Sequence, residues 1–133
     1  MKTYLDTGVL ISAFRVSGVA GQYAMKILDD PSRRFGSSIF VRLEATPKAI
    51  YHQNSTEQEF YRVFFDAVTC WADDIESIVA NAYRVSSTYG LAAMDALHIA
   101  AALSIEAEEF ITTEKLTKPM FRVSEIQVIS LFS

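Results

Sequence analysis

Residues 90–105 read GLAAMDALHIAAALSI, and this stretch predicts a helix at the centre of the domain. Alanine and leucine dominate it, and both are strong helix formers. Apolar side chains cover nearly every side, which is typical of a helix buried inside a domain. Two polar residues, Asp95 and His98, are three positions apart and therefore share one face. A carboxylate is rarely buried without a charged or hydrogen-bonding partner, so Asp95 points to a bound cation.

The composition is that of one folded domain covering residues 1–133. Half of the residues are hydrophobic, which is enough for a single core. No apolar run reaches the roughly 18 residues of a membrane span. One cysteine, Cys70, cannot form an internal disulfide, which favours a reducing, cytoplasmic location. The net charge of −4 argues against nucleic acid as a partner, unless some of the acids hold divalent cations.

Short strand patterns alternate with helical patterns along the chain. Strands are expected at residues 2–5, 34–37, 68–71, 110–112 and 127–132. Helices are expected at residues 9–14, 19–30, 39–52, from 54 onward, 75–89 and 90–105. This alternation predicts the α/β class, with a mostly parallel sheet and helices on both of its faces.

The expected helix at residues 39–52 carries an apolar stripe and a proline. Ile39, Phe40, Leu43 and Ile50 are predicted to belong to the core. Pro47 should kink or divide the helix, because its ring clashes with the preceding turn.

Four carboxylates are expected at one edge of this sheet. Asp6 ends the first strand, and Glu114 follows the strand at residues 110–112. Glu44 and Asp95 lie in the opening turns of two crossover helices. Helices run antiparallel to the strands in such a fold, so all four acids project toward the carboxyl edge. Open α/β sheets bind ligands at this edge, where the strand order switches.

Clustered carboxylates repel one another unless they are protonated or bridged by cations. Oxygen ligands select hard ions, so Asp6, Glu44, Asp95 and Glu114 are candidate ligands of Mg²⁺ or Mn²⁺. Such ions suit phosphodiester hydrolysis, because they activate water and offset charge on the phosphate.

Four motifs in order resemble the PIN domain family. They are residues 4–11 (YLDTGVLI), 42–44 (RLE), 94–100 (MDALHIA) and 111–115 (ITTEK). The resemblance implies a three-layer α/β/α sandwich with four to five strands, Mg²⁺- or Mn²⁺-dependent cleavage of RNA, and frequent dimers. In small bacterial members it often implies a VapC-type toxin neutralised by an antitoxin. His98 is expected to be structural, and Thr7 and Thr113 are candidate contacts to water or phosphate.

Two residues depart from the family pattern. Gly8 stands where Ser, Asn or Thr is usual, so a hydroxyl or amide near the site is missing. Glu114 replaces the usual Asp and is longer by one methylene, although it could still be a ligand.

A cluster of aromatic residues follows residue 50, and it has two interpretations. One domain of this size can hardly bury all of them, so an internal position and a partner-facing groove both stay open. Surplus apolar area favours an interface, and we therefore expect a homodimer, an antitoxin bound in the groove, or both. The residues are Tyr51, Phe60, Tyr61, Phe64 and Phe65.

Three functional classes compete. The first is a metal-dependent endoribonuclease that acts as the toxin of a toxin–antitoxin pair. The second is a catalytically weak or inactive PIN-like module that binds RNA or protein, which Gly8 and Glu114 favour. The third is a phosphoacceptor protein using Asp6, which is disfavoured because Gly8 stands where a phosphatase of that type needs a second Asp.

Overall fold

Five parallel strands form the central sheet, in the order β3-β2-β1-β4-β5. The computed structural model describes residues 1–132. The strands are β1 (Lys2–Leu5), β2 (Arg34–Ser38), β3 (Cys70–Ala72), β4 (Glu109–Thr112) and β5 (Gln127–Ser130). All four strand pairs are parallel. The α/β class and the mostly parallel sheet predicted from the sequence are therefore confirmed.

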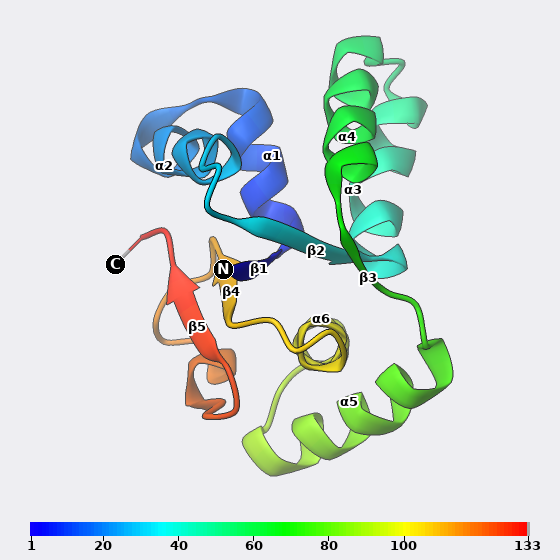
Figure 1. Ribbon diagram of the computed structural model, residues 1–133, viewed down its shortest axis with the longest axis vertical. Coiled ribbons are helices and arrows are strands. Elements are labelled where there is room, and N and C mark those ends of the chain that lie inside the picture. The colour runs from blue at the N-terminus through cyan, green and yellow to red at the C-terminus, as the bar shows by residue number, and fades with distance from the viewer. Residues whose placement is uncertain (133) are drawn as a thin grey trace.

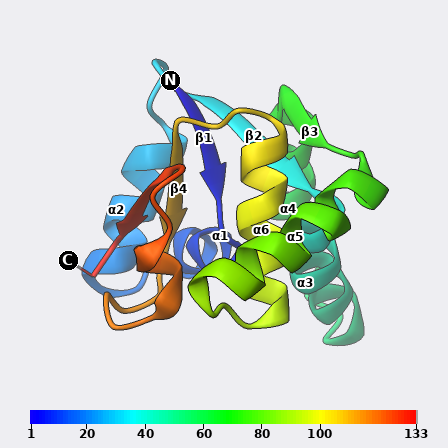
Figure 2. The same ribbon diagram turned by 90° about the horizontal axis from the view of Figure 1, so that it is seen from below.

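Helices cover both faces of the sheet, which gives the α/β/α sandwich. Figure 1 shows α1 to α4 on one side of the strands and α5 with α6 on the other. In Figure 2, which views the molecule from below, α5 and α6 lie in front of the strands. The helices are α1 (Thr7–Arg15), α2 (Gly18–Leu28), α3 (Ile39–Tyr51), α4 (Ser55–Ala67), α5 (Ile75–Tyr89), α6 (Ala93–Ser104) and the short 3-10 helix η1 (Pro119–Arg122).

The strand order switches between β1 and β4. The chain passes from β1 to β2 and β3 on one side, then returns through α5 and α6 to β4 on the other side of β1. Crossovers therefore leave the carboxyl ends of β1 and β4 in opposite directions, which opens a crevice at this edge. Asp6 directly follows β1, and Thr113 and Glu114 directly follow β4.

Helix α6 is buried, as its composition predicts. Its buried positions are Ala96 and residues 98–102, while Asp95 in the first turn is half-buried. Gly90 adopts the left-handed conformation at φ 74° and ends α5, so α6 begins three residues after it. No helix within residues 1–132 combines the length and the apolar character that crossing a membrane requires.

The core face of α3 differs from the prediction. Val41, Ala45 and Ala49 are buried at i, i+4 and i+8, whereas Leu43 is 64% exposed. Ile39 and Ile50 are also exposed, and Phe40 is half-buried. Small side chains let α3 pack closely, and the larger apolar stripe points outward. The helix also runs through Pro47 without being divided.

The aromatic cluster lies mostly inside the domain, which corrects the prediction of a partner-facing groove there. Tyr61, Phe64 and Phe65 are buried, and Phe60 is half-buried. These rings pack against aromatic side chains of α1, β2 and β3, in the pairs Phe14–Phe60, Phe35–Phe64 and Phe65–Trp71. Tyr51 alone among the five predicted residues is exposed, at 81%. Because the rings of α4 pack against rings of other elements, the domain buries more of them than the sequence pattern suggested.

Candidate functional site

A cavity of about 220 Å³ opens at the carboxyl ends of β1 and β4. All four carboxylates predicted from the sequence line it: Asp6, Glu44, Asp95 and Glu114. The other lining residues are Thr7, Gly8, Ile11, Lys48, Met94, His98 and Thr113. The structure therefore brings together acids that lie on four separate elements of the chain.

Asp6 is held in place by hydrogen bonds on both carboxylate oxygens. It is the N-cap of α1, and its Oδ1 accepts a hydrogen bond from the Thr7 backbone N–H at 2.8 Å. Its Oδ2 accepts from the buried Thr112 hydroxyl at 2.8 Å. The Thr112 hydroxyl oxygen also accepts from the Glu114 backbone N–H at 3.1 Å. Thr112 thereby links β1 to the turn that carries Glu114.

Glu44 is held by a buried chain of polar side chains. Its Oε1 accepts from the Thr7 hydroxyl at 2.8 Å and lies 2.5 Å from His98 Nε2. The other ring nitrogen, His98 Nδ1, lies 3.0 Å from the Tyr4 hydroxyl, which lies 2.7 Å from Ser38 Oγ. Burial raises the pKa of Tyr4, so this phenol stays protonated.

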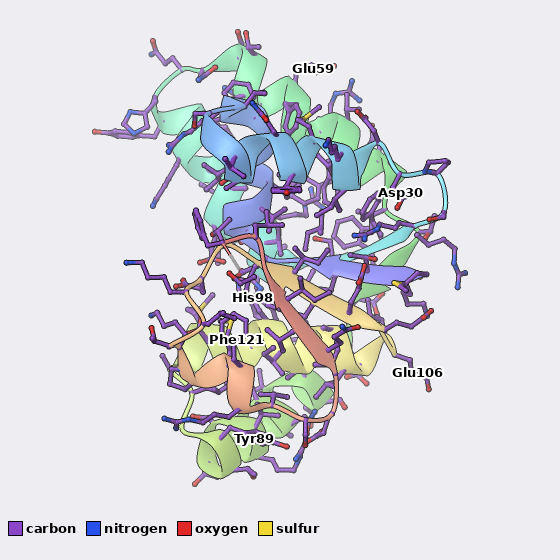
Figure 3. The ribbon with its side chains drawn as sticks, turned by 90° about the vertical axis from the view of Figure 1, so that its left-hand side faces the viewer. Asp30, Glu59, Tyr89, His98, Glu106 and Phe121 are labelled. Carbon is purple, nitrogen blue, oxygen red and sulfur yellow. The ribbon has the colours of Figure 1, made fainter. Side chains whose placement is uncertain are left out.

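His98 therefore has a structural role, as expected from the sequence, and it orients the Glu44 carboxylate. It is 3% exposed, and Figure 3 shows it near the middle of the molecule, while Asp30 and Glu59 lie at the periphery. The hydrogen-bonded series Ser38–Tyr4–His98–Glu44 was not predicted from the sequence, because its bonds join residues far apart in sequence. Position 98 on the Asp95 face of the helix was the only sequence indication of it.

Asp95 differs from Asp6 and Glu44 in having no partner. Its carboxylate makes no hydrogen bond or ion pair with any of residues 1–132. Burial raises the pKa of Asp95 above its ordinary value, and the negative charges of Asp6 and Glu114 raise it further. The charges of Lys118 and His98 lower this pKa by less than the other effects raise it. The fold therefore holds a carboxylate without a hydrogen-bond partner beside other acids, which is an arrangement that a cation stabilises.

Glu114 lies at the rim of the cavity. Its side chain is 38% exposed, and its Oε2 lies 3.9 Å from Lys118 Nζ. The charge of Glu114 reaches Asp95, because it contributes to the raised pKa of that residue. The extra methylene of Glu114 thus leaves the carboxylate on the cavity wall.

The donor set fits a hard divalent cation. Among residues 1–132, Asp6, Glu44 and His98 offer ligand atoms within 4.8 Å of one another. His98 Nε2 and Glu44 Oε1 contact each other, so the oxygens of Asp6 and the second oxygen of Glu44 are the freer donors of this group. Asp95 and Glu114 line the same cavity but do not belong to the group. Oxygen donors of this kind select Mg²⁺ or Mn²⁺ over zinc.

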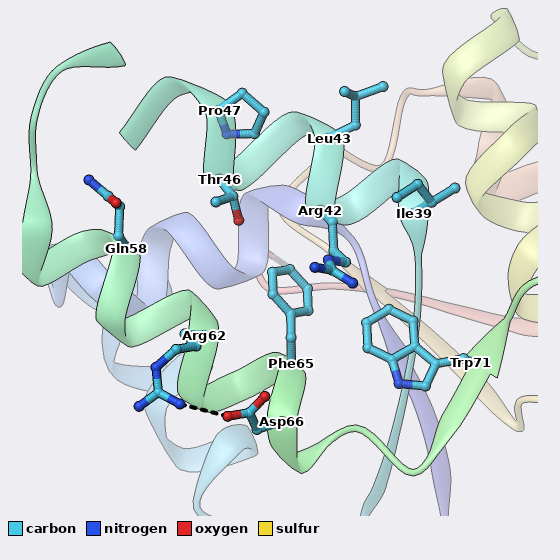
Figure 4. A pocket seen from close by; sticks show the side chains of 10 residues that line it. All are labelled: Ile39, Arg42, Leu43, Thr46, Pro47, Gln58, Arg62, Phe65, Asp66 and Trp71. Carbon is cyan, nitrogen blue, oxygen red and sulfur yellow. Dashed lines mark hydrogen bonds and ion pairs between the residues drawn. The ribbon is translucent and has the colours of Figure 1, made fainter. Parts of the chain in front are cut away.

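A larger cavity, of about 510 Å³, lies between α3 and α4 and has a different character. Figure 4 shows Arg42 directed toward Phe65 and Trp71, and Asp66 paired with Arg62. The Arg42 guanidinium lies 5.7 Å from each ring centroid. Asp66, the one acid among residues 1–132 that lines this larger cavity, is paired with Arg62, so the smaller cavity with four acids is the candidate site.

The sequence profile of the PIN domain family matches residues 3–116 of this chain. No functionally curated protein matches it. Several solved structures are similar to this chain along nearly their whole length. VapBC2 from Rickettsia felis, bound to a DNA fragment from its promoter, gives a TM-score of 0.73 at 13% identity, covering 96% of this chain and 97% of that one.

A toxin–antitoxin complex from Klebsiella pneumoniae gives a TM-score of 0.72 at 19% identity, with 97% of each chain covered. VapBC-1 from nontypeable Haemophilus influenzae gives 0.68 at 17% identity, with 100% of each chain covered. At these identities the likeness establishes the fold, and the family follows from the profile match.

Proposed function

Because this chain belongs to the PIN domain family, we propose that it is a divalent-metal-dependent endoribonuclease that hydrolyses RNA phosphodiester bonds. PIN domains are generally nucleases, and this chain keeps an acidic cavity at the expected edge of the sheet. The observation that carries the proposal is Asp95, a carboxylate without a partner whose pKa is raised by burial and by neighbouring acids. A buried structural acid would have a hydrogen-bond donor beside it, and none of residues 1–132 donates one to Asp95.

We assign the metal to Asp6, Glu44, Asp95 and Glu114, as Mg²⁺ or Mn²⁺. When bound, the ion supplies activation of water and charge compensation at the phosphate. Thr7 and Thr112 fix the Asp6 carboxylate, and Thr7 and His98 fix that of Glu44. Donors held in this way need little reorganisation during the reaction, which is how preorganised sites lower a barrier.

Metal-dependent cleavage of RNA tests this function. The purified protein should cut single-stranded RNA with Mn²⁺ or Mg²⁺ and should stop when EDTA is in excess. Heat-denatured protein from the same preparation controls for contaminating nuclease. RNA binding without cleavage at any divalent ion would favour the PIN-like binding module instead, and cleavage that continues undiminished in EDTA would contradict the proposal.

We also propose that the chain is the toxin of a toxin–antitoxin pair and acts in the cytoplasm. Support comes from the three similar structures, two of which are VapBC assemblies and one a toxin–antitoxin complex. Cys70 is a free thiol, which suits a reducing compartment. A short adjacent gene for a DNA-binding protein that suppresses the toxicity of this chain would support the pairing, and growth unaffected by expression of the chain alone would contradict it.

A homodimer is the third part of the proposal, and it uses a different surface from the aromatic cluster. Leu43 on α3 is 64% exposed, and Val79 and Tyr83 on α5 are 50% and 80% exposed. The first residues of both helices, Ile39 and Ile75, line one shared cavity, so the two apolar stripes begin next to each other. Adjoining exposed apolar stripes of this kind mark protein interfaces.

Leu43→Asp or Val79→Asp should therefore convert a dimer into a folded monomer, because a charge enters an apolar interface. Light scattering coupled to size-exclusion chromatography measures this directly. Val63→Asp is the matched control, since Val63 on α4 is 55% exposed and lies outside both stripes. A wild-type protein that is monomeric at all concentrations would refute the dimer, as would a Leu43→Asp variant that stays dimeric.

A further inference from the structure

Gly8 lies in the first turn of α1 at a position where the backbone does not require glycine. Its φ is not positive, unlike those of Gly18 and Gly90. Glycine is also among the least favoured residues within a helix. Conformational freedom therefore does not account for Gly8, and its missing side chain is the feature to explain.

The space beside Gly8 is occupied by the hydroxyl of Thr113. A Cβ added at residue 8 would overlap Thr113 Oγ1, so one of the two side chains would have to shift. The same Cβ would lie 3.5 Å from Thr113 Cβ and 3.7 Å from its Cγ2, which are ordinary contacts. A single atom, the Thr113 hydroxyl oxygen, therefore excludes a side chain from position 8.

The backbone of Thr113 cannot easily withdraw, because hydrogen bonds hold the residues on both sides of it. The Thr112 carbonyl accepts from the Leu131 N–H at 2.9 Å, and the Glu114 N–H donates to Thr112 Oγ1 at 3.1 Å. The sheet thus sets the position of the Thr113 Cβ, and the hydroxyl can leave Gly8 only by rotation about χ1, which is restricted in a β-branched residue.

The Thr113 hydroxyl is also available for a ligand. It lines the acidic cavity and has no hydrogen-bond partner among residues 1–132. The other two threonines near the site are already engaged, since Thr7 donates to Glu44 and Thr112 donates to Asp6. The site therefore keeps one half-buried neutral donor that is not used to hold a carboxylate.

We propose that the Thr113 hydroxyl takes the place of a residue-8 side chain and donates a hydrogen bond to a phosphate oxygen of bound RNA. A wall of carboxylates repels a phosphodiester, and a hydroxyl is a donor that can approach the phosphate without neutralising those acids. This inference rests on the proposed ribonuclease function and adds a substrate contact to it.

The exclusion of a side chain is tested by melting temperature, without any activity. Gly8→Ala in the otherwise wild-type protein should lower the melting temperature by several degrees, because the new Cβ overlaps the Thr113 hydroxyl. The same change made in Thr113→Ala protein should leave the melting temperature unchanged or raise it, since the overlap is gone and alanine favours the helix. An equal fall in melting temperature in the wild-type and Thr113→Ala proteins would contradict the overlap between a residue-8 side chain and the Thr113 hydroxyl.

The substrate contact is tested by moving the hydroxyl from residue 113 to residue 8. Thr113→Val keeps the shape but removes the donor, and should lower kcat/KM for single-stranded RNA with Mn²⁺ by about tenfold or more. Gly8→Ser/Thr113→Ala should recover most of that loss, whereas the matched Gly8→Ala/Thr113→Ala should stay as low as Thr113→Val. The Mn²⁺-induced rise in melting temperature should be the same in Thr113→Val and wild type, because the hydroxyl is not placed as a metal ligand.

Two failures can be told apart in this experiment. Wild-type protein that shows no metal-dependent cleavage contradicts the proposed function, and this inference falls with it. Wild-type protein that cleaves while Thr113→Val cleaves equally well contradicts this inference alone. A Gly8→Ser/Thr113→Ala protein that cleaves no better than its alanine counterpart also contradicts it.

Discussion

Asp6→Asn and Asp95→Asn should each lower the Mn²⁺-dependent rate of RNA cleavage by about 100- to 1,000-fold, the range seen when a preorganised electrostatic group is removed. Both acids line the cavity and carry charge that a cation would use. Asparagine has nearly the same shape as aspartate and is also a good N-cap, so α1 should still begin at Thr7. The loss should therefore be one of chemistry, with the far-ultraviolet circular dichroism spectrum retained.

The double variant Asp6→Asn/Asp95→Asn should be little worse than either single variant, because groups that act as one site are not additive. Asp66→Asn is the matched control, since Asp66 is an exposed aspartate that pairs with Arg62 outside the acidic cavity. Initial rates on a labelled single-stranded RNA measure the four variants and the wild type. Cleavage by Asp95→Asn at the wild-type rate would remove Asp95 from the site.

Asp95→Asn should also make the metal-free protein more stable at neutral pH. The pKa of Asp95 is raised in the folded protein, first by burial and then by the charges of Asp6 and Glu114. The folded state therefore binds this proton more tightly than the unfolded state does. The contribution of Asp95 to stability is complete below its ordinary pKa of 3.8 and is lost as the pH rises through the raised pKa.

Asparagine cannot ionise, so the advantage of Asp95→Asn should be small in acid and reach its full size above the raised pKa. Each kcal/mol relieved corresponds to a rise on the order of 2–8 °C in melting temperature for small and medium domains. Asp6→Asn is the contrasting variant and should melt lower than wild type, because Asp6 accepts two hydrogen bonds and asparagine offers one acceptor oxygen. Melting curves in EDTA from acid to neutral pH measure both. A metal-free Asp95→Asn protein that melts below wild type at neutral pH would show that Asp95 is a satisfied structural acid.

The position of the site could be predicted from local patterns, because it depends only on where elements begin and end. Asp6 after β1, Asp95 at the start of α6 and Glu114 after β4 all follow from reading strands and helices in order. In a parallel sheet, those ends meet at one edge without further information. The four acids therefore reached one cavity in the structure as expected.

The contacts that hold those acids could not be predicted, because each joins residues distant in sequence. The Thr112–Asp6 bond spans 106 positions, and the His98–Glu44 bond spans 54. The Gly8–Thr113 exclusion likewise depends on the distance between two loops. From the sequence alone, Gly8 indicates only that a hydroxyl or amide is missing near the site.

The apolar pattern failed where a helix has two apolar faces. On α3, the larger residues Leu43 and Ile50 suggested the core, but Ala45 and Ala49 occupy it. Side-chain size is a poor guide when helices pack closely, because small residues then fill the contact. The same uncertainty made the buried rings of α4 look like surplus surface.

The stabilisation of the protein by Mn²⁺ tests the central claim most directly, because it depends on the four carboxylates forming one metal site. A cation that binds only the folded state stabilises it by about 2.7 kcal/mol at a hundredfold excess over Kd. Mn²⁺ should therefore raise the melting temperature of metal-free wild-type protein, whereas NaCl at matched ionic strength should not. In Asp95→Asn the rise should be much smaller, with the starting melting temperature higher. A full Mn²⁺ shift in Asp95→Asn, or no shift in the wild type, would contradict the assignment of these acids to a metal site.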